Sequence, residues 1–100
     1  MLYAIIAEDV PNSGGKRAAV RDAHMKRMTD LQNAGRLIIS GPCPAIDSPD
    51  PGPAGFSGSV IIAEFDSLEA AREWIAADPY VTSGAFANVT VKPFRKGFPR

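Results

Sequence analysis

The stretch SVIIAEFDSLEAAREWIAADPY, residues 59–80, runs from an apolar segment directly into a helical pattern. Residues 59–65 are apolar at consecutive positions, which is typical of a strand covered on both faces. Asp66 and Glu69 have capping-box spacing, so we expect Asp66 to accept helix amides and Glu69 to reach back. The apolar face of the helix contains Leu68, Ala71, Trp74 and Ile75. A strand followed by an amphipathic helix is therefore predicted.

The rest of the chain also alternates between strand patterns and a helix pattern. Residues 2–7 are apolar and predict a first strand, and residues 16–34 contain no proline or glycine and predict a long helix. Gly35 stands where a glycine commonly ends a helix. Residues 36–41 form a second apolar strand, and residues 88–94 alternate as a last one.

The resulting β-α-β-β-α-β order predicts an α+β, ferredoxin-like fold: a four-stranded antiparallel sheet with both helices on one face. One hundred residues suffice for one such domain, residues 1–100. Three of the strands are apolar on both faces, so the face without helices needs a cover. The simplest cover is a second copy packed sheet to sheet, which predicts a homodimer and leaves a higher oligomer open.

Residues 42–58 are rich in proline and glycine and predict a long irregular loop, functional or mobile, over a cleft. Cys43 lies between two prolines in this segment and has no neighbouring base to activate it. A packing role is therefore favoured for this side chain. A lone cysteine excludes an internal disulfide and fits a reducing compartment.

Composition excludes several classes of function. Eleven basic and eleven acidic residues cancel, which gives no electrostatic case for nucleic acid or anionic lipid as a partner. The apolar N-terminal segment is far shorter than the roughly 20 residues of a membrane span, so a cytoplasmic protein is predicted. One histidine and one cysteine give no spaced ligand cluster, and no phosphate-binding glycine loop occurs. Neither a metal nor a cofactor is expected.

His24 and Asp78 are the candidates for chemistry. His24 lies on a helical apolar stripe and has Arg17 and Arg21 on the adjoining face, which suits a general base beside an anion. A packed core histidine is the plainer alternative. Asp78 precedes Pro79 and can cap a short turn, or it can orient His24 by accepting a hydrogen bond from Nδ1. Capping and orienting are compatible, since a carboxylate has two oxygens.

The motifs RDAH (21–24), GP (41–42) and DPYVTSGAF (78–86), together with the closing VKPF (91–94), resemble those of the YciI-like family. The resemblance extends over nearly the whole chain. It implies a ferredoxin-like fold that dimerises through its sheets, as in muconolactone isomerase and the dimeric α/β-barrel group. It also implies an active-site cleft with a His24–Asp78 dyad and with Arg21 holding an anionic group.

Two functions follow from these observations. The first is a cofactor-independent enzyme that moves a proton on a small anionic compound, aromatic or enolisable, as an isomerase or as a lyase that eliminates HX. One branch of the resembled family is similar to a dehydrochlorinase of a chlorinated hydroxyhydroquinone. The second is a binding or regulatory module that holds the same ligand without turnover.

Overall fold

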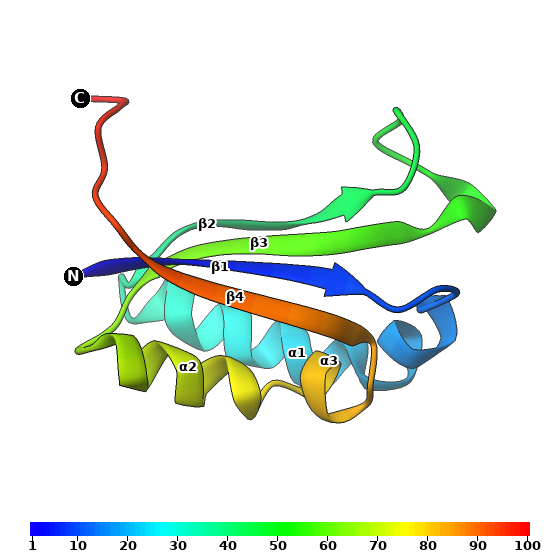
Figure 1. Ribbon diagram of the computed structural model, residues 1–100, viewed down its shortest axis with the longest axis horizontal. Coiled ribbons are helices and arrows are strands. Elements are labelled where there is room, and N and C mark those ends of the chain that lie inside the picture. Colours follow the sequence, from blue (N-terminus) through cyan, green and yellow to red (C-terminus); the bar gives the residue numbers. More distant parts are fainter.

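The computed structural model describes residues 1–100 (Figure 1). Its elements are β1 (Leu2–Asp9), α1 (Gly14–Asn33), β2 (Leu37–Pro44), the short 3-10 helix η1 (Gly52–Ala54), β3 (Phe56–Glu64), α2 (Leu68–Ala76), α3 (Pro79–Thr82) and β4 (Phe86–Phe94). The predicted order of strands and helices is confirmed, with α3 as an additional short turn of helix. No helix is long and apolar enough to cross a membrane.

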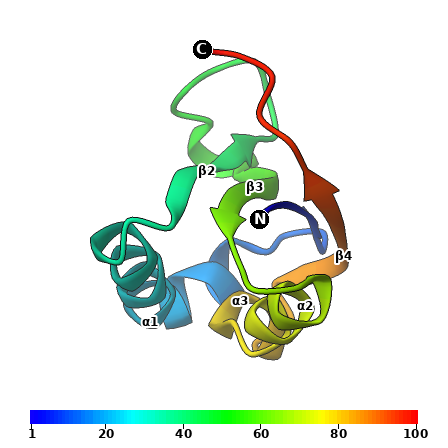
Figure 2. The same ribbon diagram turned by 90° about the vertical axis from the view of Figure 1, so that its left-hand side faces the viewer.

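The four strands form one sheet in the order β2-β3-β1-β4, and every neighbouring pair is antiparallel. All three α-helices lie on one face of it, with α1 under the β2 side and α2 and α3 under the β4 side (Figure 2). This arrangement confirms the ferredoxin-like α+β fold.

The hydrophobic core lies between the sheet and the helices. Strand residues reach it by alternation, since successive side chains point to opposite faces of a sheet. The strands and α1 contribute Tyr3, Ile5, Ala7, Ile61, Ala63, Phe86, Met28 and Leu31. The chain after β3 contributes Phe65, Ala71, Ile75, Tyr80 and Ala85. These residues pack the helices against the sheet, and that packing fixes the position of the His24 side chain relative to the sheet.

Two local predictions are wrong. The irregular loop predicted over 42–58 is shorter, because β2 and β3 continue pairing until Pro44 meets Phe56. The prolines of β2 fit a strand here because β2 is at the sheet edge, where a missing N–H costs no ladder bond on the free side. The cap of α2 is Ser67 rather than Asp66: Ser67 Oγ accepts from the Ala70 amide at 3.0 Å.

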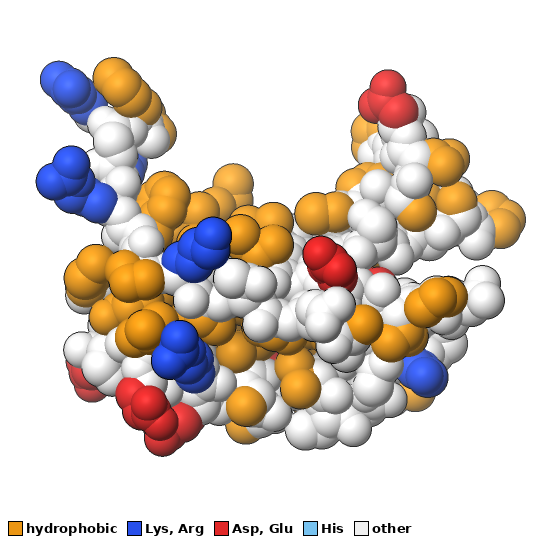
Figure 3. Space-filling model, in the orientation of Figure 1, with side chains coloured by type: hydrophobic (Ala, Val, Ile, Leu, Met, Phe, Trp, Pro, Cys, Tyr) orange, Lys and Arg blue, Asp and Glu red, His pale blue; other side chains and the backbone are white.

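The sheet face opposite the helices is apolar and uncovered. The register places Ile6 beside Val60 and Ile39 beside Ile62 on this face. Ile6 is 44% exposed and Ile39 is 60% exposed. The β2–β3 loop and the C-terminal end of the chain rise beside the face (Figure 1), and orange apolar atoms show between them in Figure 3.

We propose that a second copy of the chain covers this face, because an uncovered apolar sheet face is unusual in a small monomer. Ile39→Glu should then shift the protein from dimer to monomer, since it places two charges in the interface. Sedimentation equilibrium measures the change. Ala19→Glu, on an exposed position of α1, is the matched control and should leave the mass unaltered. A wild-type protein with the mass of one chain at all concentrations would refute the dimer.

Candidate active site

The His24 side chain lies under the sheet, on the face of α1 that turns toward the core, and the residue is 9% exposed. Its Nδ1 is 2.9 Å from Oδ1 of Asp78 and 3.1 Å from Oδ2. The two residues are 54 positions apart in sequence, and packing of α1 against α3 brings them together. Their predicted proximity is therefore present in the fold, and their catalytic role stays a prediction.

Asp78 has several roles at once. Its side chain is fully buried and caps α3, where Oδ1 accepts from the Tyr80 amide at 2.9 Å. Oδ2 accepts from Nη1 of Arg27 at 2.9 Å. The second Arg27 nitrogen, Nη2, donates to the Trp74 carbonyl at 2.7 Å, and the guanidinium lies over the Trp74 ring. The capping role and the contact with His24 coexist on one carboxylate.

This environment determines the charge of Asp78. Burial acts to raise the pKa of its carboxyl, but the hydrogen bonds from His24 and from the Tyr80 amide, with the charges of His24 and Arg27, outweigh it and lower the pKa. The carboxylate is therefore ionised at neutral pH and only accepts hydrogen bonds. A neutral His24 must then carry its proton on Nδ1, which leaves the Nε2 lone pair free. No protein group bonds Nε2.

The His24 ring stacks on Tyr80, with ring centroids 3.9 Å apart and planes inclined by 15°. Burial raises the pKa of the Tyr80 phenol, although the charges of Arg17 and Arg21 act in the opposite direction. A neutral phenol therefore lies against the imidazole. Sequence reasoning did not assign Tyr80 to the site, although its place in the DPY motif, two residues after Asp78, was a usable signal.

Arg17 was noted in the sequence only as a neighbour of His24. In the structure it is 8% exposed, and its Nε and Nη2 bind both oxygens of Asp9 at 2.6 and 2.8 Å. Nη2 also donates to Ser59 Oγ and to the Gly58 carbonyl, each at 3.0 Å. Arg17 thus ties α1 to β1 and β3 beside the candidate site.

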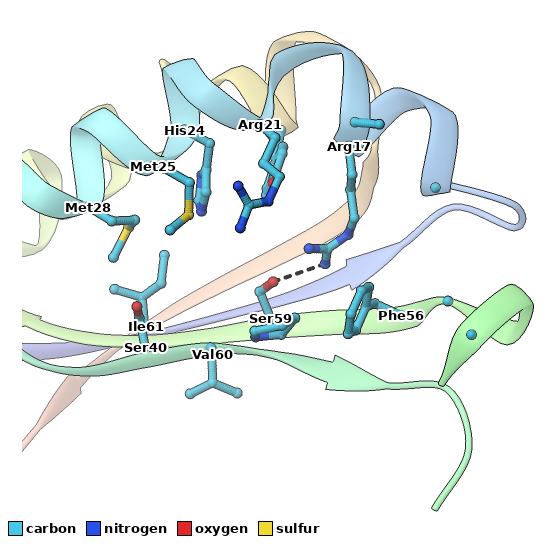
Figure 4. A pocket seen from close by; sticks show the side chains of 17 residues that line it. Arg17, Arg21, His24, Met25, Met28, Ser40, Phe56, Ser59, Val60 and Ile61 are labelled. Atoms are coloured by element: carbon cyan, nitrogen blue, oxygen red, sulfur yellow. Dashed lines mark hydrogen bonds between the residues drawn. The ribbon is translucent and has the colours of Figure 1, made fainter. Parts of the chain in front are cut away.

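A cavity of about 500 Å³ lies between α1 and the β2–β3 part of the sheet. In Figure 4 the side chains of Arg17, Arg21 and His24 point from α1 into this space. Its wall also contains Met25, Met28, Ser40, Phe56, Ser59, Val60, Ile61 and Tyr80. The base of the β2–β3 loop contributes to the wall as well, through Gly52 and Gly55.

Arg21 is exposed within the cavity and forms no salt bridge or hydrogen bond with the protein. It is therefore an available positive charge one helical turn from His24. Cys43 is partly buried on β2 and does not line the cavity. No group of three or more His, Cys, Asp or Glu side chains is placed to hold a metal ion.

The fold and the site together define a ferredoxin-like α+β protein that has a histidine-containing cavity between its sheet and its first helix. The model of the YCII-related domain matches residues 1–95, so the chain belongs to that family. Protein YciI of Escherichia coli is 56% identical over 98 residues, which are 98% of this chain and all of that protein. An uncharacterized protein of Haemophilus influenzae is 52% identical over the same shares of the two chains.

A solved structure gives a further comparison. The 5-chloro-2-hydroxyhydroquinone dehydrochlorinase TftG of Burkholderia phenoliruptrix, in complex with 2,5-dihydroxybenzoquinone, superposes with a TM-score of 0.85. The match covers 97% of this chain and 96% of that chain at 25% sequence identity. The fold is therefore similar over the whole chain.

Asp78 should contribute to the pH dependence of stability. Because folding lowers its pKa, the stabilisation is present above the unfolded pKa of about 4 and is lost as pH falls through the folded value. Asp78→Asn should therefore lower the free energy of unfolding near pH 7 by about 1.5–3 kcal/mol, with a smaller difference near pH 3. Urea denaturation at both values measures this. A difference that does not shrink in acid would contradict the ionised carboxylate.

Proposed function

We propose that the protein is a cofactor-independent enzyme that transfers a proton on a small anionic compound, with His24 as the base. The observation that carries the proposal is the orientation of one ring: Nδ1 of His24 bonds a buried carboxylate, while Nε2 is left free in a cavity. A base held by an orienting acid is the recurrent arrangement of proton-transfer sites.

In the proposed step, Nε2 removes a proton from a carbon or hydroxyl of the substrate, and Asp78 stabilises the imidazolium that forms. The electron pair left on the substrate moves onto an oxygen, where the Arg21 guanidinium opposes the developing negative charge. Return of the proton at another carbon completes an isomerisation. In an elimination the electron pair instead returns from the oxygen and forms a carbon–carbon double bond as the carbon–halogen bond breaks. The halide leaves and His24 passes its proton to water, so that HX is lost overall.

The similarity to TftG supports the elimination outcome, because that protein is a dehydrochlorinase and is similar over nearly the full length of both chains. The apolar part of the cavity wall also suits an aromatic ring, with Met25, Met28 and Ile61 on one side of His24. A chlorinated hydroxyhydroquinone is therefore a rational first compound to test.

Purified protein should release chloride from 5-chloro-2-hydroxyhydroquinone under anaerobic conditions, which prevent oxidation of the compound by air. His24→Gln should lower the rate roughly 100- to 10,000-fold, the usual contribution of a positioned base. A chloride-selective electrode measures the rate, and thermal unfolding verifies that the variant is folded. Lys26→Met, on the solvent side of α1, is the control and should retain the full rate.

Full activity in a folded His24→Gln variant would refute the proposal. Saturable binding of the compound, without chloride release and without deuterium exchange at its ring carbons in D2O, would favour the binding module instead. That module needs the same cavity and the same positive charge, but it needs no base.

A further inference from the structure

The cavity has two chemically different ends, and the order of residues along α1 sets them. Arg17, Arg21, His24 and Met28 follow one another at helical spacing on the same side of the helix. With a rise of about 1.5 Å per residue, Arg21 lies about 4.5 Å before His24 along the axis, and Arg17 about 10 Å before it. Met25 and Met28 lie in the other direction, as Figure 4 shows.

The end near Arg17 offers hydrogen-bond donors that the protein leaves unused. Nε and Nη2 of Arg17 are bonded to Asp9, Gly58 and Ser59, and the Tyr80 hydroxyl also interacts with the guanidinium. Ser59 Oγ accepts from Arg17, so its own proton is free to donate. Arg21 leaves its whole guanidinium unpaired. Arg21 from α1 and Ser59 from β3 thus present free donors to one end of the cavity, beside the Arg17 guanidinium.

The charge at this end is positive. No Asp or Glu lines the cavity. Asp9 neutralises Arg17 through a bidentate pair and does not itself line the cavity, so Arg21 supplies the uncompensated charge. A neutral ligand would leave these donors desolvated beside an unpaired cation, whereas an oxyanion would satisfy them.

The opposite end is mainly apolar, with the Ser40 hydroxyl beside Ile61 as its polar group (Figure 4). Met28 and Ile61 are both buried and face the cavity from α1 and β3, and Met25 completes this end. Methionine side chains adapt to ligands of different shape. This end offers few hydrogen bonds, so it suits a hydrocarbon or a ring substituent.

We propose that the end of the cavity formed by Arg17, Arg21 and Ser59 is an oxyanion subsite, which binds a carboxylate or phenolate oxygen and fixes the direction of the ligand. The rest of the ligand, apolar or aromatic, lies past His24 against Met25 and Met28. This orientation of the bound ligand does not depend on whether the protein catalyses a reaction. Only the placement of the proton-bearing atom at His24 rests on the proposed function.

Benzoate and benzamide provide the test, because they have nearly the same shape and differ in charge. Isothermal titration should show wild type binding benzoate at least about tenfold more tightly than benzamide. Arg21→Met should weaken benzoate about 10- to 100-fold, the loss expected for a charge-assisted contact, and should leave benzamide unaltered. Lys16→Met removes an equal charge from α1 outside the cavity and should leave both affinities unaltered.

Arg17 is a poor target for this experiment, since its loss would leave Asp9 buried and unpaired. The variant Ser59→Ala is therefore used in place of an Arg17 variant. It should lower the affinity for benzoate severalfold while Arg17 stays bonded to Asp9. Equal affinity of wild type for benzoate and benzamide, or an unchanged benzoate affinity in Arg21→Met, would overturn the subsite.

His24→Gln separates the two proposals. The subsite predicts that this variant still prefers benzoate, whether or not turnover depends on His24. If wild type binds benzoate no more tightly than benzamide but releases chloride in a reaction that depends on His24, only the subsite is overturned. Retained preference with a His24-independent reaction would overturn only the role of His24 as the base.

Discussion

A buried negative charge is the constraint on which the helix side of this structure depends. Asp78 is fully buried, and an ionised carboxylate in that position is costly unless hydrogen bonds and opposite charges surround it. The partners come from the start of α3 and from two positions on α1, His24 and Arg27. The two helical segments are therefore held in one relative position by electrostatics as well as by apolar packing.

The same arrangement explains why the candidate site lies where it does. Arg27 of α1, which also bonds the Trp74 carbonyl of α2, and the Tyr80 amide of α3 each bond one oxygen of Asp78, and His24 Nδ1 contacts both oxygens. Stacking on Tyr80 then limits rotation of the imidazole ring. The orientation of Nε2 follows from contacts that also stabilise the fold, which is how a small domain positions a side chain without additional elements.

The sequence predicted the architecture well because its signals are local. Apolar runs, the uninterrupted helix before Gly35 and the pairing of Asp78 with Pro79 each act within a few residues, and Gly35 has the positive φ that its place required. The prediction failed where neighbouring residues compete for one role, as with Asp66 and Ser67 at the cap of α2. It also failed where strand pairing, rather than composition, set the length of the loop.

The candidate site was less accessible to sequence reasoning. His24 and Asp78 stood out because each is unusual for its position, whereas their contact across 54 residues is a property of the packed fold. Arg27 gave no signal, because an arginine on a helix is usually a solvated surface residue. Ser59 likewise gave no signal, because the sequence indicates only a strand residue there and its bond to Arg17 is visible only in the structure.

The prolines at the end of β2 have a consequence for how the protein avoids unwanted association. An edge strand is a template for adding foreign strands, because its outer backbone groups are unpaired. Pro42 and Pro44 remove two donors from that edge, and a register shift between Leu37 and Ile39 distorts the ladder at its other end. Both ends of the β2 edge are thus poor templates for a further strand, so association of other chains through this edge is disfavoured.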